Sequence, residues 1–169
     1  MRVNFKSSLT EVLKSEGGYS DHPKDPGGAT NKGITLRTYN YFTHKDKTKA
    51  DLRNITDYEV QNIYLTGYWV KCHCDFLPSG VDYCLFDAAV NSGPTRATRW
   101  LQQAVDVKID GIFGSKTMRS INGYTPGEII EVFCDIRLRF LRGLKTWDDF
   151  GNGWGKRVER VKIFSLNIV

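Results

Sequence analysis

The apolar residues of the chain recur mostly at the spacing of amphipathic helices. The first such stripe consists of Phe5, Leu9, Val12 and Leu13. Residues at these intervals lie along one face of an α-helix. The Gly17-Gly18 pair is expected to stop this helix, because glycine readily adopts the left-handed backbone geometry of a helix end. We therefore predict a first helix whose final turn contains Glu16.

Capping patterns place further helices along the chain. Thr56 and Glu59 have the spacing of a capping box, and so do Thr125 and Glu128. In such a box each side chain binds a backbone N–H that the first helical turn leaves free. Thr35 could cap a short helix that runs through residue 42. Three helix starts are therefore predicted from side-chain chemistry.

The remaining segments complete a mainly α picture. Residues 20–33 form a polar loop with two prolines and three glycines, long enough to be a functional loop. The apolar residues 81–90 predict a buried helix, and Pro94 suits the first turn of the next one. A last helix is expected after Gly153-Trp154. Residues 107–113 could pair as a small hairpin around Asp110-Gly111, so the predicted fold is one mainly α domain with a small β element.

The overall charge favours an anionic partner without identifying it. The chain of 169 residues has a formal net charge of +5 and a pI of about 9.0. Nucleic acid, an acidic membrane surface and a bacterial wall are all anionic. The basic residues are scattered, and no nucleic-acid-binding motif is present. Nucleic-acid binding is therefore the weakest of these alternatives.

The chain start and the cysteines bear on where the protein is made. The first eight residues lack the apolar core of a secretory signal, and no stretch is long enough to span a bilayer. We expect synthesis in a cytoplasm, where Cys72, Cys74, Cys84 and Cys134 would usually be reduced thiols. Cys72-His73-Cys74 does not match the spacing of known zinc sites, so buried thiols are favoured over a metal centre.

Glu16 is the first candidate for catalysis. The partial negative charge at a helix C-terminus disfavours a carboxylate, and this position therefore favours the protonated form that a general acid needs. The alternative is an ordinary solvated glutamate, which describes most glutamates on helices. The position of Glu16 alone does not decide between the two.

Asp25 and Thr30 strengthen the catalytic interpretation. Asp25 lies in the polar loop, from which it could face Glu16. Cleavage of a glycosidic bond uses one carboxylic acid to protonate the leaving oxygen, and a second carboxylate to stabilise positive charge or to activate water. Thr30 could hold that water. The alternative for Asp25-Pro26-Gly27-Gly28 is an ordinary turn.

Several blocks of sequence resemble a known family. Residues 16–20 (Glu-Gly-Gly-Tyr-Ser) and 23–35 resemble the signature of glycoside hydrolase family 108, whose members are N-acetylmuramidases and often phage endolysins. Residues 75–83 and 91–94 are similar to its middle block. Residues 110–117 are similar to a part described as a predicted peptidoglycan-binding region. Phage lysozymes have a similar Glu-to-Asp spacing, with a catalytic Thr one position further on.

The resemblance implies a fold, an activity and a place of action. It implies a lysozyme-like single domain over residues 1–169, with the catalytic signature in about 1–90. Residues 91–169 would be a helical part that resembles a peptidoglycan-binding region and packs on the same core. The implied activity is cleavage of the β-1,4 bond between N-acetylmuramic acid and N-acetylglucosamine. A phage lysin waits in the cytoplasm until a separate pore-forming protein releases it to the wall.

Candidate substrate-binding residues lie outside the catalytic trio. Tyr19, Tyr68 and Trp69 could offer aromatic faces to sugar rings, and for Trp69 a place in the core is an equal alternative. On a helix, Asp87 and Asn91 would share one face and could meet sugar acetamido groups. An internal hydrogen-bonding or capping role is the alternative for both.

Other classes of function remain open at this stage. A lytic transglycosylase would cleave the same bond with one Glu and leave an anhydro sugar. A non-catalytic wall-binding module would suit the basic charge, but it would have no use for Glu16. Acid–base glycoside hydrolysis needs no cofactor or metal, and a monomer without stable membrane insertion is expected.

Overall fold

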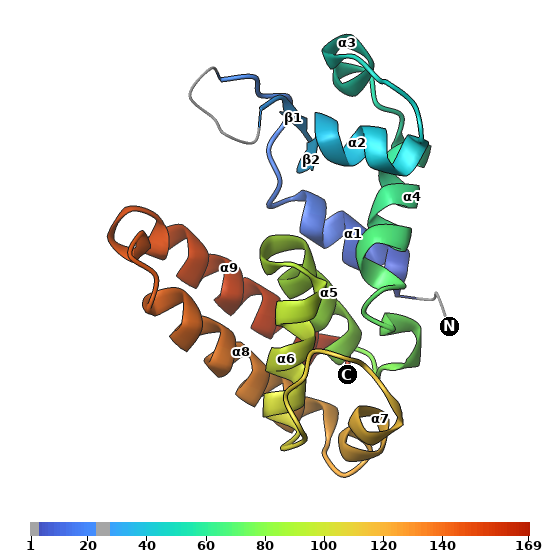
Figure 1. The fold of residues 1–169 in the computed structure, drawn as a ribbon. Helices are drawn as coiled ribbons and strands as arrows, with labels where there is room; N and C mark the ends of the chain where they lie inside the picture. Colours follow the sequence, from blue (N-terminus) through green and yellow to red (C-terminus); the bar gives the residue numbers. More distant parts are fainter. Residues whose placement is uncertain (1–3, 23–27) are drawn as a thin grey trace.

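The computed structural model describes residues 4–22 and 28–169. Figure 1 shows α8 and α9 side by side with α5 and α6, while the small β-sheet, α2 and α3 form a separate group at the other end. α1 and α4 lie between these two groups. None of the helices in the described ranges combines the length and apolar content needed to cross a bilayer.

The described residues form α-helices, two short strands, one π-helix (η1) and one 3₁₀-helix (η2), and both η1 and η2 lie between α4 and α5. In chain order, the elements are α1 (Phe5–Leu13), β1 (Thr30–Asn31), β2 (Ile34–Thr35), α2 (Leu36–Thr43), α3 (Lys49–Arg53), α4 (Asp57–Tyr64), η1 (Leu65–Trp69), η2 (Cys74–Phe76), α5 (Val81–Ser92), α6 (Pro94–Ala104), α7 (Ser115–Ile121), α8 (Pro126–Arg142) and α9 (Trp147–Asn167). The strands pair antiparallel, with Thr30 opposite Thr35. The prediction of a mainly α, lysozyme-like domain with a small β-hairpin is confirmed.

The capping predictions are also confirmed. The Thr56 side chain accepts from the Glu59 backbone N–H at the start of α4, and Glu59 completes the box. Thr125 and Glu128 do the same at the start of α8. Thr35 accepts from the backbone N–H of residue 38 at the start of α2. These three helices therefore begin where local side-chain chemistry satisfies free N–H groups of the first turn.

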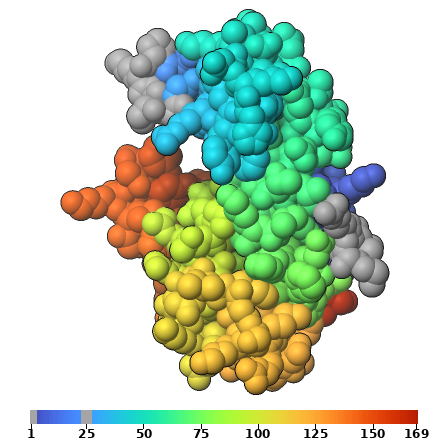
Figure 2. Space-filling view, turned by 45° about the vertical axis from the view of Figure 1, so that its right-hand side comes forward, coloured from blue at the N-terminus to red at the C-terminus, as the bar shows by residue number. Residues whose placement is uncertain are grey.

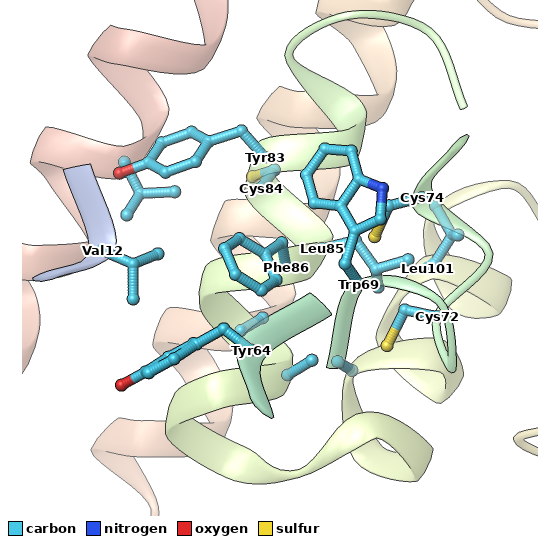
Figure 3. Close-up of a cluster of buried hydrophobic side chains, with 14 of the residues drawn as sticks. Val12, Tyr64, Trp69, Cys72, Cys74, Tyr83, Cys84, Leu85, Phe86 and Leu101 are labelled. Carbon is cyan, nitrogen blue, oxygen red and sulfur yellow. The ribbon is translucent and has the colours of Figure 1, made fainter. Parts of the chain in front are cut away.

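The core is built around aromatic rings on α1, η1 and α5. The rings of Phe5 and Trp69 meet edge to face at 5.5 Å, and those of Trp69 and Phe86 at 5.3 Å (Figure 3). The same hydrophobic cluster extends to Val161 on α9. Edge-to-face pairs of this kind contribute beyond the area they bury. The C-terminal helices thus share one core with the N-terminal segments.

The predicted hairpin lies elsewhere than expected. Residues 107–113 form a loop, because the side chain of Gln102 takes the hydrogen bonds that a hairpin would need. Gln102 Nε2 donates to the Ile112 carbonyl at 3.1 Å, and its Oε1 accepts from the Gly111 N–H at 2.7 Å. The strands that do form are at Thr30–Asn31 and Ile34–Thr35. One buried glutamine therefore replaces the expected strand pairing.

Two helix boundaries also differ from the prediction. α1 ends at Leu13, before the glycine pair. α9 begins at Trp147 and continues through Gly151 and Gly153. A β-carbon at Gly151 would lie 2.5 Å from the Trp147 ring, so the indole packs directly on the glycine backbone. That contact explains why position 151 of the helix is a glycine.

The four cysteines are buried free thiols. Cys84 on α5 and Cys134 on α8 face each other with their sulfurs 3.4 Å apart. The hydrogen bond with Cys134, together with burial, raises the pKa of the Cys84 thiol well above its usual range. The cysteines therefore behave as small apolar core residues, as the sequence indicated.

Candidate active site

Glu16 lies just beyond the end of α1. Its backbone N–H donates to the Leu13 carbonyl at 3.2 Å, which continues the helix by a tight turn after the cap at Lys14. Glu16 therefore lies in the turn that follows α1, and the expectation that it sits in the final turn of the helix is corrected. The electrostatic argument from the helix end is replaced by a direct contact, since an arginine binds the carboxylate.

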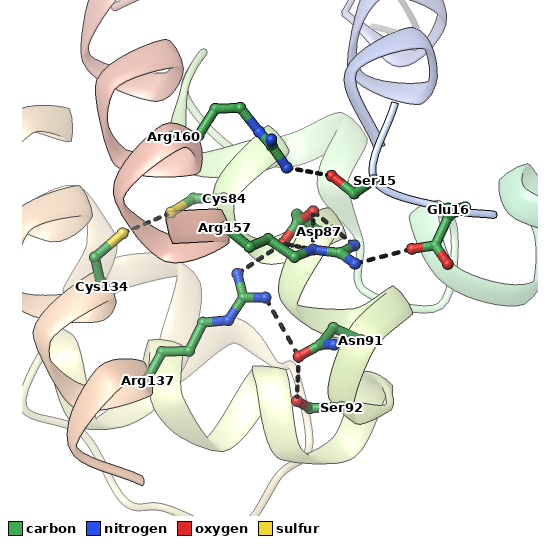
Figure 4. Close-up of polar contacts among 10 residues, drawn as sticks. All are labelled: Ser15, Glu16, Cys84, Asp87, Asn91, Ser92, Cys134, Arg137, Arg157 and Arg160. Carbon is green, nitrogen blue, oxygen red and sulfur yellow. Dashed lines mark hydrogen bonds and ion pairs between the residues drawn. The ribbon is translucent and has the colours of Figure 1, made fainter. Parts of the chain in front are cut away.

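That arginine comes from the other end of the chain. Arg157 on α9 donates from Nη1 to Glu16 Oε1 at 3.0 Å (Figure 4). Only 18% of the Glu16 side chain and 12% of the Arg157 side chain are exposed. A charge-assisted hydrogen bond at this degree of burial is stronger than a surface ion pair. The ion pair therefore fixes the orientation of the Glu16 carboxyl group.

The second oxygen of Glu16 lies against the turn of the β-hairpin. A β-carbon at Gly33 would be 2.7 Å from Glu16 Oε2 and 2.6 Å from the Tyr64 hydroxyl. Gly33 also has φ +73°, a region that other residues rarely adopt. Glycine at this position therefore allows the hairpin, Glu16 and Tyr64 to meet.

Two tyrosines complete the surroundings of Glu16. Tyr64 on α4 donates to the Lys32 carbonyl at 2.8 Å, and its ring lies 5.6 Å from that of Tyr68. Burial raises the pKa of both hydroxyls, and the nearby Glu16 carboxylate adds to the effect. Both phenols therefore stay neutral near Glu16 and act as fixed hydrogen-bonding groups.

Arg157 is itself held by a buried acid on α5. Asp87 is completely buried and contacts Arg157 Nη2 at 2.9 Å and Arg137 Nη1 at 2.7 Å. Burial alone would raise the pKa of Asp87, but the two guanidinium groups outweigh it and hold that pKa below its usual range. A chain of charges thus runs from Arg137 through Asp87 and Arg157 to Glu16, as Figure 4 shows.

This network changes the interpretation of Asp87 and Asn91. Asp87 is saturated by arginines in the interior, so the expectation that it meets a sugar is corrected. Asn91 Oδ1 accepts from Arg137 at 3.4 Å and from the Ser92 hydroxyl at 3.1 Å. Both contacts match the internal hydrogen-bonding alternative. Asp87 thus holds the base of the site from the interior, whereas Asn91 is exposed at the end of α5, and its contact with a sugar stays a prediction.

The structure places the three aromatic candidates for sugar binding in different surroundings. Trp69 is completely buried, and its indole N–H donates to Asp75 at 2.9 Å, so the core alternative applies and the sugar-platform expectation is corrected. Tyr19 is half-buried, with the Arg53 guanidinium 4.4 Å above its ring. Tyr68 lines a hollow of about 360 Å³ together with Tyr41 on α2. Tyr68 is therefore the candidate that joins Glu16 to an open surface.

The other two members of the predicted trio are placed differently. Asp25 lies outside the described residues. Thr30 is half-buried on β1, and its backbone N–H and C=O pair with Ser20 at 2.8 and 2.9 Å. The bridge from Ser20 to Thr30 closes the base of the loop that follows Glu16. Thr30 is thus fixed in the hairpin that contacts Glu16 through Gly33.

Arg137 and Arg157 were not predicted from the sequence. Arginines on helices are usually solvated, and neither residue has a neighbouring motif that marks it as buried. A weak signal was the apolar spacing of α8, which places position 137 next to Ile136 and Phe133 in the buried stripe. Arg157 and Glu16 are 141 positions apart in the sequence, and no local sequence pattern predicts a contact between such distant residues.

The groups available at this site are carboxyl, guanidinium and phenol. Within residues 4–22 and 28–169, no cluster of three or more His, Cys, Asp or Glu side chains is arranged to bind a metal. A carboxyl group held in one orientation beside a hairpin and two tyrosines is a candidate for acid–base chemistry.

Comparisons with known proteins identify the family and the fold. The family model described as Glycosyl hydrolase 108 matches residues 9–93. The fold is similar to the structure of Brucella abortus SagA, with a TM-score of 0.89 and 42% sequence identity. That similarity covers 99% of this chain and 96% of the other. No curated protein matches the chain.

Proposed function

The chain belongs to the glycosyl hydrolase 108 family, and from this premise we propose that it is an N-acetylmuramidase with Glu16 as its general acid. The substrate would be the β-1,4 bond between N-acetylmuramic acid and N-acetylglucosamine in bacterial peptidoglycan. The observation that supports this most is the position of Glu16, which is held by Arg157 and lies against Gly33 at the hairpin.

The proposed reaction begins with a proton transfer. Glu16 donates its proton to the glycosidic oxygen as the bond to that oxygen breaks and positive charge develops on the sugar. Asp25 is proposed as the carboxylate that stabilises this charge or activates the water, and Thr30 as the group that positions the water. The water adds to the sugar carbon and gives its proton to the carboxylate that activates it, either Asp25 or Glu16 after Glu16 has released its own proton, so that one bond is hydrolysed per molecule of water.

Arg157 has a positioning role in this proposal. It binds one oxygen of Glu16 and is itself fixed by Asp87 through paired contacts at 2.9 and 3.1 Å. A proton donor must be held in one geometry relative to the bond it cleaves, because small displacements lower the rate steeply. The buried ion pairs supply that restraint from the C-terminal helices.

A substitution of the acid tests the proposal. We expect Glu16→Gln to keep the fold, because glutamine has the same shape and can still accept from Arg157. Clearing of a suspension of bacterial cell walls should fall by at least about a hundredfold, in line with the loss of general acid catalysis. Glu11→Gln is the matched control, since this glutamate on α1 pairs with Lys14 on the surface. Normal clearing by Glu16→Gln would contradict the proposal.

Partner and place of action follow from the same proposal. The net charge of +5 supports attraction to an anionic wall. By resemblance to phage lysins, we infer release from the cytoplasm through a separate pore-forming protein, action on the wall as a monomer and no stable membrane insertion. We also propose that the loop at Asp110, which contacts Gln102 at 2.8 Å, belongs to a wall-contacting region.

A further inference from the structure

The first turns of α9 expose aromatic rings at the surface. The rings of Phe150 and Trp154 lie 5.7 Å apart with an interplanar angle of 30°. Phe150 is 56% exposed, and Trp154 is half-buried. Trp147, which is also half-buried, packs against Trp154 with their rings 6.3 Å apart. Phe150 and Trp154 thus form an apolar surface beside the Trp147 indole.

This surface is unusual because of the backbone that carries it. α9 contains Gly151, Gly153 and Gly155 within its first nine residues, and each glycine inside a helix costs about 1 kcal/mol relative to alanine. At Gly151 the cost has a structural reason, since a β-carbon would lie 2.5 Å from Trp147. The helix therefore accommodates the Trp147 indole at the expense of its own intrinsic stability.

Phe150 and Trp154 lie on the same face of α9 as the arginine that binds Glu16. Phe150, Trp154 and Arg157 occupy positions i, i+4 and i+7 of one helix, and residues at these positions share a face. Further along that face, Val161 is in the core with 1% exposure. Exposure increases from Val161 through Arg157 to Phe150. The face therefore leaves the core at Arg157 and reaches the surface within two helical turns.

The arrangement of elements places this face at an opening. In Figure 1 the end of α9 that follows α8 projects on the same side as β1 and β2. Figure 2 shows the surface hollowed between the orange segment, which contains the start of α9, and the blue and cyan segments of the hairpin and α2. Glu16 bridges these two parts, since it contacts Arg157 on one side and lies against Gly33 on the other.

We propose that Phe150 and Trp154 form a saccharide-binding platform beside Glu16 that holds a sugar of the glycan strand. Aromatic faces bind the apolar faces of sugar rings, and N-acetylated amino sugars present such a face. The occupant is thus a glycan of alternating N-acetylglucosamine and N-acetylmuramic acid, which continues from the bond at Glu16. This inference rests on the proposed function and assigns a substrate-contacting role to α9.

The test separates sugar binding from catalysis. Peptide-free glycan strands, released from peptidoglycan by an amidase, are titrated by calorimetry into the inactive Glu16→Gln protein. In that background, Phe150→Ala and Trp154→Ala should each raise the dissociation constant about tenfold, which corresponds to the stacking energy of one aromatic ring. In the active protein they should raise KM for cell walls by a similar factor and leave kcat within about twofold.

Two controls complete the test. Phe76→Ala removes a phenylalanine of similar exposure, 64%, from a 3₁₀-helix away from α9, and it should leave both constants unchanged. Trp154→Phe keeps an aromatic face and should bind nearly as well as the parent, while Phe150→Ala covers the case in which Trp154→Ala does not fold.

Unchanged dissociation constants and KM for Phe150→Ala, with Trp154→Ala unchanged or unfolded, would overturn the platform even if the enzyme hydrolyses walls normally. Full wall clearing by Glu16→Gln would overturn the proposed function instead, whatever the binding data show.

Discussion

At the scale of single residues, the site depends on charges that are paired in the interior. Asp87 is buried between two arginines, and Arg157 passes this restraint to Glu16. Breaking a buried ion pair costs more than the pair contributes, because it leaves one charge without compensation. Changes in this chain of charges should therefore affect both the stability of the fold and the rate of the reaction.

Arg157→Lys tests the positioning role. Lysine keeps the charge but lacks the planar fork that binds Asp87 and Glu16 together. We expect kcat for wall hydrolysis to fall about a hundredfold, with little change in KM, because the substrate surface is intact. Arg160→Lys is the control, since this neighbour on α9 binds the Ser15 hydroxyl. Equal effects of the two substitutions on kcat would contradict a specific role for Arg157.

At the scale of elements, local side-chain chemistry determines where α2, α4 and α8 begin. The boxes at Thr56 and Thr125 and the cap at Thr35 were readable because each donor and acceptor lies within three residues. The end of α1 and the start of α9 could not be predicted from the local sequence. The start of α9 involves the contact of Trp147 with Gly151. Glu16 was predicted from its motif, whereas Arg157 becomes visible only when distant helices pack.

Glu59 gives α4 a pH-dependent contribution to stability. Its carboxylate accepts from the Tyr39 hydroxyl at 2.6 Å and from the capping threonine. These bonds, that from Tyr39 above all, lower the pKa of Glu59 from 4.5 to about 2. A depressed value stabilises the fold above pH 4.5, and this contribution is lost as the pH falls through about 2. The packing of α2 on α4 should therefore weaken in acid.

Glu59→Gln measures that contribution. The free energy of unfolding at pH 7 should fall by about 1–2 kcal/mol through the loss of charged hydrogen bonds. Below pH 2 the variant and the wild type should converge. Urea denaturation at several pH values gives both quantities. A constant difference between the two proteins from pH 7 to below pH 2 would show that the charge of Glu59 has no such role.

At the scale of the whole molecule, the N-terminal and C-terminal parts share one hydrophobic core and one network of ion pairs. The family match covers residues 9–93, yet Arg157 lies far beyond them. Val158 and Val161 of α9 are buried in the core that also contains Phe5 and Trp69. The C-terminal helices therefore complete both the hydrophobic core and the charge network at Glu16.

A truncated chain tests whether the rest of the molecule needs α9. A chain that ends at Gly143 lacks α9, so it exposes the apolar faces of α5 and α8 and leaves Asp87 with one arginine. We expect it to unfold without a cooperative transition and to clear no cell walls, as measured by circular dichroism and turbidity. Removal of the exposed Val169 alone should change neither property. Normal lysis by the truncated chain would show that α9 is dispensable.

The most direct measurement of the central claim is mass spectrometry of the products released from purified peptidoglycan. For the wild type we predict fragments that end in reducing N-acetylmuramic acid and carry one added water per cleaved bond. For Glu16→Gln we predict none of these fragments above background. Anhydro-muramic ends as the only product of the wild type, or the same reducing fragments from Glu16→Gln, would contradict hydrolysis by Glu16.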